Sequence, residues 1–163
     1  IDNEKGSQLL TDPDRQVVSH SGEVSNNDYA SIKSQVQNLL DDDASFKAFT
    51  GQFLTAAKHD LDTLLPDEPF EMEEVSNLLN SHAIKRLGGL RAFYFEDTIE
   101  QGLCYINGTE LQFSSDIANG VKLLCDNVML TPNAMSEWSH NAAFVELATE
   151  LLNQGYWYLA EAE

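Results

Sequence analysis

The sequence reads Ile84-Lys85-Arg86-Leu87-Gly88-Gly89-Leu90-Arg91 near its middle, where two glycines separate two short pieces with the composition of β-strands. A glycine pair between two strands is typical of a tight turn, because glycine accepts backbone angles that other residues avoid. We therefore predict a strand, a turn and a second strand within one small antiparallel sheet.

This stretch holds three of the nine basic residues of the chain, Lys85, Arg86 and Arg91. They could bind an anionic group, or they could be surface charges that pair with acids. Charges that flank a tight turn usually belong to the second kind. Because the rest of the sequence is acidic, we expect Arg86 and Arg91 to pair with nearby carboxylates.

The second half of the chain alternates short strands with helices. Asn107-Gly108 is the strongest hairpin signal, and Thr131-Pro132 is typical of a cap followed by a proline at the first helical position. The predicted strands are residues 84–87, 90–95, 103–106, 110–113 and 156–159, and the predicted helices are residues 71–80, 116–127 and 142–153. This order predicts a mostly helical α+β fold that ends in a winged-helix-like domain with a small antiparallel sheet.

Two amphipathic helices are predicted before that domain. The first has Asn27 as its N-cap and ends near Asp41, and the second follows Asp43, which can cap it, and continues to Leu61. Residues 64–69 contain two prolines and two acids, a composition that ends a helix. We predict a linker or arm over residues 1–26, a helical dimerisation region over residues 27–65 and the winged-helix-like domain over residues 66–163.

Each of these two helices carries an apolar stripe that it cannot bury completely against the other. The remainder packs either on the rest of the same chain or on a second copy through an isologous interface, and periodicity favours neither. For a homodimer, the candidate interface residues are Tyr29, Ile32, Val36, Leu39, Phe46, Phe49 and Phe53.

Composition narrows the possible partners. The 163 residues, 42% of them hydrophobic, allow one ordinary domain or two small ones. A formal net charge of -18 opposes binding to a phosphate backbone, so a basic protein is the expected partner and nucleic acid is not. No apolar run reaches the roughly 20 residues of a membrane span, and no secretory signal is evident, so we expect a cytoplasmic protein. The start at Ile1 suggests a piece of a longer protein.

Catalytic motifs are missing from the sequence. None of the four histidines belongs to a His-x-Asp, His-x-Glu or His-Glu-x-x-His motif, and there is no nucleophile elbow and no phosphate loop. Cys104 could act as a nucleophile, but no histidine lies near it in sequence. The helix at residues 116–127 has one lysine against two aspartates, which is unsuited to reading DNA. We expect no catalytic, cofactor or metal-binding residue in this chain, and no enzyme activity of its own.

Several short segments, in this order and spacing, carry a family resemblance from about Thr11 to the end of the chain. They are Asp12-Pro13-Asp14, Phe46-Lys47-Ala48-Phe49 through Phe53, His59-Asp60-Leu61-Asp62, Arg86-Leu87-Gly88-Gly89-Leu90-Arg91, Tyr105-Ile106-Asn107-Gly108 and Gly155-Tyr156-Trp157-Tyr158. With them the chain resembles the C-terminal region of bacterial ribosomal oxygenases of the JmjC and cupin superfamily, the YcfD-type ribosomal protein arginine hydroxylases.

The resemblance implies a parent protein in three parts: a JmjC barrel that binds Fe(II) and 2-oxoglutarate, a helical dimerisation region, and a winged-helix-like domain. Only the last two parts would be present here, and no catalytic residue carries over to this sequence. The parent would hydroxylate an arginine of a basic large-subunit ribosomal protein, while this region would support homodimer assembly and substrate docking.

Two other hypotheses remain open from the sequence. The first is a freestanding acidic interaction module that mimics nucleic acid and occupies a basic partner. The second is a small enzyme that uses Cys104 or a pair of histidine and carboxylate side chains. The coding sequence before Ile1 would separate the leading hypothesis from the first alternative, since only the leading one predicts a barrel there.

Overall fold

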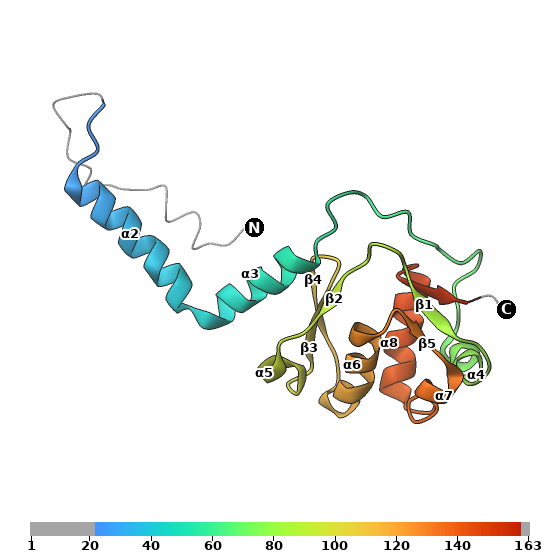
Figure 1. Cartoon of the computed structure of the whole chain (residues 1–163). Helices are drawn as coiled ribbons and strands as arrows, with labels where there is room; N and C mark the ends of the chain where they lie inside the picture. Colours follow the sequence, from blue (N-terminus) through green and yellow to red (C-terminus); the bar gives the residue numbers. More distant parts are fainter. Residues whose placement is uncertain (1–21, 161–163) are drawn as a thin grey trace. The chain divides into compact units, whose positions relative to one another are not determined.

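The computed structural model describes residues 22–160 (Figure 1). Most of the predicted arm, residues 1–21, lies outside the described residues. The chain divides into two compact units, Ile1–Lys47 and Ala48–Glu163, and each is described by itself. The domain limits expected at residues 26 and 65 stay predictions.

The first unit contains helix α2 (Asn26–Asp41) and the start of helix α3 (Asp43–Thr55). The predicted N-cap was wrong by two residues: Ser25 caps α2, and its hydroxyl accepts a hydrogen bond from the Asp28 amide at 3.0 Å. Likewise Asp42, rather than Asp43, accepts from the Ser45 amide at the start of α3. Serine and aspartate are both strong cap formers, so neighbouring candidates in a polar run are hard to rank from sequence.

Helix α3 ends six residues earlier than predicted. Its last residue, Thr55, donates a side-chain hydrogen bond back to the Gly51 carbonyl at 2.7 Å, and the Gly108 amide donates to the same hydroxyl at 3.0 Å. The end of the helix is therefore fixed by a contact with the hairpin at residues 107–108. Residues 56–71 form no helix or strand, so Leu61 lies in a connecting segment.

The second unit has two three-stranded antiparallel sheets where the sequence predicted one. Sheet A has the order β5-β1-β6 and sheet B the order β2-β3-β4. The strands are β1 (Ile84–Arg86), β2 (Ala92–Phe93), β3 (Leu103–Ile106), β4 (Thr109–Gln112), β5 (Met129–Leu130) and β6 (Trp157–Leu159). The Gly88-Gly89 turn is present, but it connects strands of different sheets. The Asn107-Gly108 hairpin is confirmed, with both residues at positive φ (48° and 77°).

Helices cover these sheets (Figure 1). They are α4 (Met72–Ser81), α5 (Glu96–Ile99), α6 (Ala118–Asp126) after the 3-10 turn η2 (Ser115–Ile117), α7 (Pro132–Met135) and α8 (Ala142–Asn153). The predicted cap at Thr131 is confirmed, because its hydroxyl accepts from the Ala134 amide, and α8 has the predicted limits. The mostly helical α+β class is therefore confirmed, while α5 and β5 were not predicted.

The core of the second unit is centred on α8. Seven of its twelve residues are buried, and α4 packs against both α7 and α8. The largest buried aromatic side chains of this unit are Trp157 of β6, Tyr105 of β3 and Phe144 of α8, each exposed by no more than 1%. Burying a large apolar side chain contributes roughly 1.5 to 3 kcal/mol, so this core holds the second unit together.

Candidate interaction surfaces

Residues 22–160 contain no group of three histidine, cysteine, aspartate or glutamate side chains that could hold a metal ion. Nor does any helix in that range have the length and apolar composition needed to cross a membrane. Two of the histidines lie apart in the fold: His59 is in the segment after α3, and His82, at the end of α4, contacts the Ser81 hydroxyl. The described residues therefore offer no metal-binding cluster, and His59 and His82 belong to different segments of the chain.

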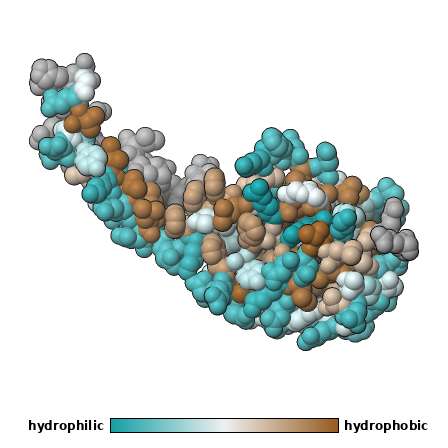
Figure 2. Space-filling model, in the orientation of Figure 1, coloured by the Kyte–Doolittle hydropathy of each residue, from teal (hydrophilic) through white to brown (hydrophobic). Residues whose placement is uncertain are grey.

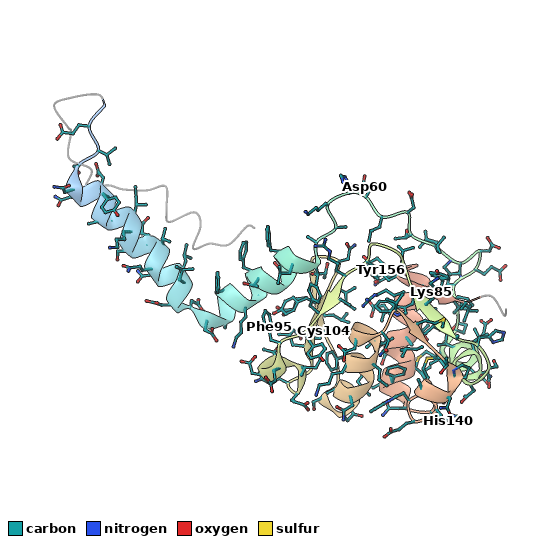
Figure 3. The ribbon with its side chains drawn as sticks, in the orientation of Figure 1. Asp60, Lys85, Phe95, Cys104, His140 and Tyr156 are labelled. Carbon is teal, nitrogen blue, oxygen red and sulfur yellow. The ribbon has the colours of Figure 1, made fainter. Side chains whose placement is uncertain are left out.

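Cys104, labelled in Figure 3, lies on β3 and is completely buried. It contacts the Cys125 thiol, a neighbour that the sequence did not predict. The hydrogen bond with Cys125, followed by burial, raises the pKa of Cys104. A nucleophilic cysteine needs the opposite shift, because the thiolate is the reactive form. This environment disfavours the nucleophile hypothesis for Cys104.

The predicted interface residues of α2 lie on the surface. Tyr29, Ile32, Val36 and Leu39 are between 40% and 64% exposed, and α2 has no buried residue. Figure 2 shows hydrophobic residues, in brown, in a row along this helix. Four large apolar side chains on one helix face are typical of a surface that another molecule covers.

The predicted interface residues of α3 are also exposed. Phe46, Phe49 and Phe53 are 44%, 45% and 68% exposed, and the rings of Phe49 and Phe53 stack with their centroids 5.8 Å apart. Because stacked rings on an open face still leave much apolar area in water, this pair is a second exposed apolar surface.

The opposite face of α3 packs on sheet B, which sequence reasoning missed. Gly51 lies so close to the ring of buried Tyr105 that a Cβ atom there would overlap the ring. A glycine inside a helix costs stability relative to alanine, and this cost is a sequence signal that a neighbour approaches closely. The approach leaves Phe49 and Phe53 on the outward face.

We expected the two arginines of the glycine stretch to pair with acids, but within residues 22–160 neither forms an ion pair. Arg86 donates from Nη1 to the Cys125 carbonyl at 2.8 Å, and Arg91 donates from Nη1 to the Leu54 carbonyl at 3.3 Å. Both carbonyls belong to the last turn of a helix, α6 and α3 respectively, where cations are stabilised by the helix dipole. Both guanidinium groups therefore serve the fold, which leaves little support for an anion site.

Charge is unevenly distributed along the chain. Residues 26–55, which include both exposed stripes, have four aspartates and two lysines, a net charge of -2. Residues 56–163 have eighteen acids and five bases, a net charge of -13. Like charges repel, so two copies of this chain could meet more readily through the first segment than through the second.

A small hollow lies between sheet B and the C-terminal half of α8, and we call it the α8 hollow. Its volume is about 150 Å³. Its apolar lining is Ile106, Leu111 and Leu151, and its polar lining includes Glu150, Gln154 and Tyr156. Gln154 donates from Nε2 to Glu150 Oε1 at 2.9 Å, and Asn107 donates from Nδ2 to the Tyr156 hydroxyl at 3.1 Å.

Comparison with known proteins gives one consistent result. The model of a family described as ROXA-like winged helix matches residues 38–158. The Escherichia coli (strain K12) protein named ribosomal protein uL16 3-hydroxylase is 25% identical over 159 residues, which are 97% of this chain and 41% of that protein. The chain thus spans about two fifths of the length of this curated relative, in its C-terminal part.

Solved structures share the fold. The structure of YcfD, a ribosomal oxygenase from Escherichia coli, has a TM-score of 0.69 at 24% identity, covering 93% of this chain and 40% of that one. The same protein in complex with cobalt and 2-oxoglutarate has the same TM-score and identity, covering 95% and 43%.

Proposed function

Because the chain belongs to the ROXA-like winged-helix family, we propose that it is the non-catalytic dimerisation and winged-helix region of an Fe(II)- and 2-oxoglutarate-dependent ribosomal protein arginine hydroxylase. In this proposal the region assembles a homodimer and helps to dock the substrate protein. The described residues offer no fit for the metal, so Fe(II) and 2-oxoglutarate would bind to another part of the parent protein.

The observation that carries the dimer is the exposure of seven large apolar side chains on α2 and α3. They are Tyr29, Ile32, Val36, Leu39, Phe46, Phe49 and Phe53. Exposed apolar surface is costly in water, and covering it with a second copy stabilises both chains. The near neutrality of residues 26–55 supports a second copy as the cover, because two chains of charge -18 repel elsewhere.

The charge of residues 56–163 supports the docking of a basic protein. The relative is named for its action on ribosomal protein uL16. An acidic surface attracts a basic protein over a long range and repels RNA, and salt weakens this attraction. Neither nucleic acid nor a membrane is a partner in this proposal, and the protein acts in the cytoplasm.

Sedimentation of the chain and of two α2 variants tests the dimer. Ile32→Arg places a charge within the exposed stripe, and Ser34→Arg places the same charge on the other side of α2. Loss of a large apolar side chain at an interface costs about 2 to 5 kcal/mol, so we expect Ile32→Arg to weaken dimerisation by at least about tenfold. Ser34→Arg should leave it nearly unchanged. If the unsubstituted chain were a monomer, or if both variants had equal effects, the proposal would be contradicted.

Incubation of the chain with iron, 2-oxoglutarate and an arginine-containing peptide tests its lack of catalysis. We expect no hydroxylated peptide by mass spectrometry, because the described residues assemble no metal-binding group. Turnover above that of a metal-free control would show that this region is itself an enzyme.

A further inference from the structure

The α8 hollow combines an apolar interior with a rim of hydrogen-bond acceptors. Ile106 and Leu151 are only 5% and 2% exposed, so they form its inner wall. Glu150 adds a carboxylate and Tyr156 a hydroxyl, and no residue of its lining is basic. Tyr156 is contributed by the segment just before β6 (Figure 3).

The volume of the hollow limits what can enter it. Pockets for drug-sized ligands measure about 300 to 1,000 Å³, well above the 150 Å³ found here. A water molecule occupies about 30 Å³ of liquid, so the hollow has room for roughly five waters. Such a space suits one amino-acid side chain better than a metabolite.

The chemistry of the hollow suits a long basic side chain. Such a side chain buries its aliphatic stem against apolar walls and keeps its cation near water. Glu150 Oε1 accepts from Gln154, but an ionised carboxylate has about four acceptor positions, so capacity for a cation remains. Glu150 is exposed at the rim, and a planar guanidinium can donate to both oxygens of its carboxylate at once, which favours arginine over lysine.

We infer that the α8 hollow receives one arginine side chain of a basic partner protein, with the stem on Ile106 and Leu151 and the guanidinium at Glu150. The inference rests on the proposed docking of a basic protein. It goes beyond that proposal by naming the site at which the winged-helix unit selects arginine over other basic side chains. The net charge of -13 over residues 56–163 brings basic segments to this unit but cannot by itself select a side chain.

The test uses the whole 163-residue chain and a short labelled peptide of alternating arginine and glycine. Two variants carry the same change of charge on the same helix, and both side chains are exposed: Glu150→Gln at the rim of the hollow and Glu146→Gln one turn earlier, outside its lining. An exposed pair of opposite charges changes affinity by up to about fivefold, so Glu150→Gln should weaken peptide binding by up to about that factor. Glu146→Gln should have a much smaller effect.

Thr109, the first residue of β4, also lines the hollow. A third variant, Thr109→Tyr, adds a large side chain there while Glu150 is retained, and it should also weaken binding. Methyl NMR of the unsubstituted chain should show chemical-shift changes at Ile106, Leu111 and Leu151 when the arginine peptide is added, but not when a citrulline peptide is added. Larger shifts with a lysine peptide would overturn the choice of arginine.

The outcomes separate this inference from the proposed function. Equal losses in Glu150→Gln and Glu146→Gln, with unshifted methyl groups, would overturn the inference and leave docking by net charge intact. If the unsubstituted chain failed to bind the arginine peptide even at low salt, both the inference and the proposed docking of a basic protein would be contradicted. The proposed dimer would be unaffected by that result.

Discussion

Gly51 shows how one residue can set the position of a helix. Its missing side chain lets α3 lie directly on the ring of Tyr105 in sheet B. Four residues later, Thr55 ends the helix and binds the hairpin through the Gly108 amide. Two neighbouring positions on one face of α3 thus fix this half of the helix to the second unit, and the aromatic rings of the other face remain outside.

We predict that Gly51→Ala destabilises the chain. In an exposed helix the same change stabilises by up to about 1 kcal/mol. Here the added methyl group would overlap the Tyr105 ring, so the helix or the ring must move, at a cost of typically 1 to 3 kcal/mol. Urea denaturation followed by circular dichroism measures the difference in the free energy of unfolding.

Gly88→Ala is the matched control for that experiment. No atom lies within 4 Å of the Cβ that this change would add, and Gly88 is not among the glycines at positive φ. We expect its free energy of unfolding to stay within about 0.5 kcal/mol of that of the unsubstituted chain. An unchanged or increased stability of Gly51→Ala would show that the contact between α3 and sheet B is not as close as described.

At the scale of elements, the arginines of the glycine stretch connect strands to helix ends. β1 is joined to the last turn of α6 through Arg86, and Arg91, just before β2, reaches the last turn of α3. The Gly88-Gly89 turn lies between the two arginines and leads from sheet A to sheet B. This short stretch therefore links both sheets to the ends of two helices.

We predict that Arg86→Met destabilises the chain more than Arg91→Met. Arg86 is partly buried and its carbonyl partner is 2.8 Å away, whereas Arg91 is exposed with a partner at 3.3 Å. Loss of a partly buried hydrogen bond from a charged group costs about 1.5 kcal/mol, and loss of an exposed charge at a helix end about 0.3 to 1 kcal/mol. Thermal or urea unfolding of both variants provides the comparison.

Lys85→Met controls for the loss of a positive charge from the same strand, because Lys85 is exposed on β1. It should change stability little. A loss equal to that of Arg86→Met would indicate that general charge, and not the bond to the Cys125 carbonyl, makes the difference.

Local signals account for the elements that the sequence predicted well. Asn141 and Thr131 cap α8 and α7 with their own side chains, and the Asn107-Gly108 pair forms its hairpin with two residues at positive φ. Such signals act within a few residues and are legible in the sequence. The apolar stripes on α2 and α3 also follow from a local pattern, the helical spacing of their apolar residues.

Elements that depend on distant residues could not be predicted in this way. The end of α3 is set by a hydroxyl that binds residue 108, and β5 exists because its two residues pair with β1. The α8 hollow is lined by side chains from residue 106 to residue 156. The periodicity of the sequence does not predict contacts between residues so far apart. Glu150 could therefore not be distinguished from the other acidic residues of the chain.

For the whole molecule, the division of charge has opposite consequences for its two proposed partners. A second copy of the chain also carries -18, so electrostatics oppose dimerisation even if the contact itself is apolar. A basic protein is attracted by the same field. Salt screens both effects, and it therefore strengthens one association while it weakens the other.

We predict that the dimer becomes tighter with salt. Between about 50 mM and about 500 mM sodium chloride the Debye length shortens to a few ångströms, which removes most repulsion between surface charges. Added salt does not weaken apolar contacts, so sedimentation equilibrium should give a dissociation constant several-fold lower at high salt. Ile32→Arg should remain mostly monomeric at both concentrations, because its defect lies within the contact. If added salt instead dissociated the dimer of the unsubstituted chain, ion pairs would hold the two copies together. The interface would then have to lie outside the apolar stripes of α2 and α3.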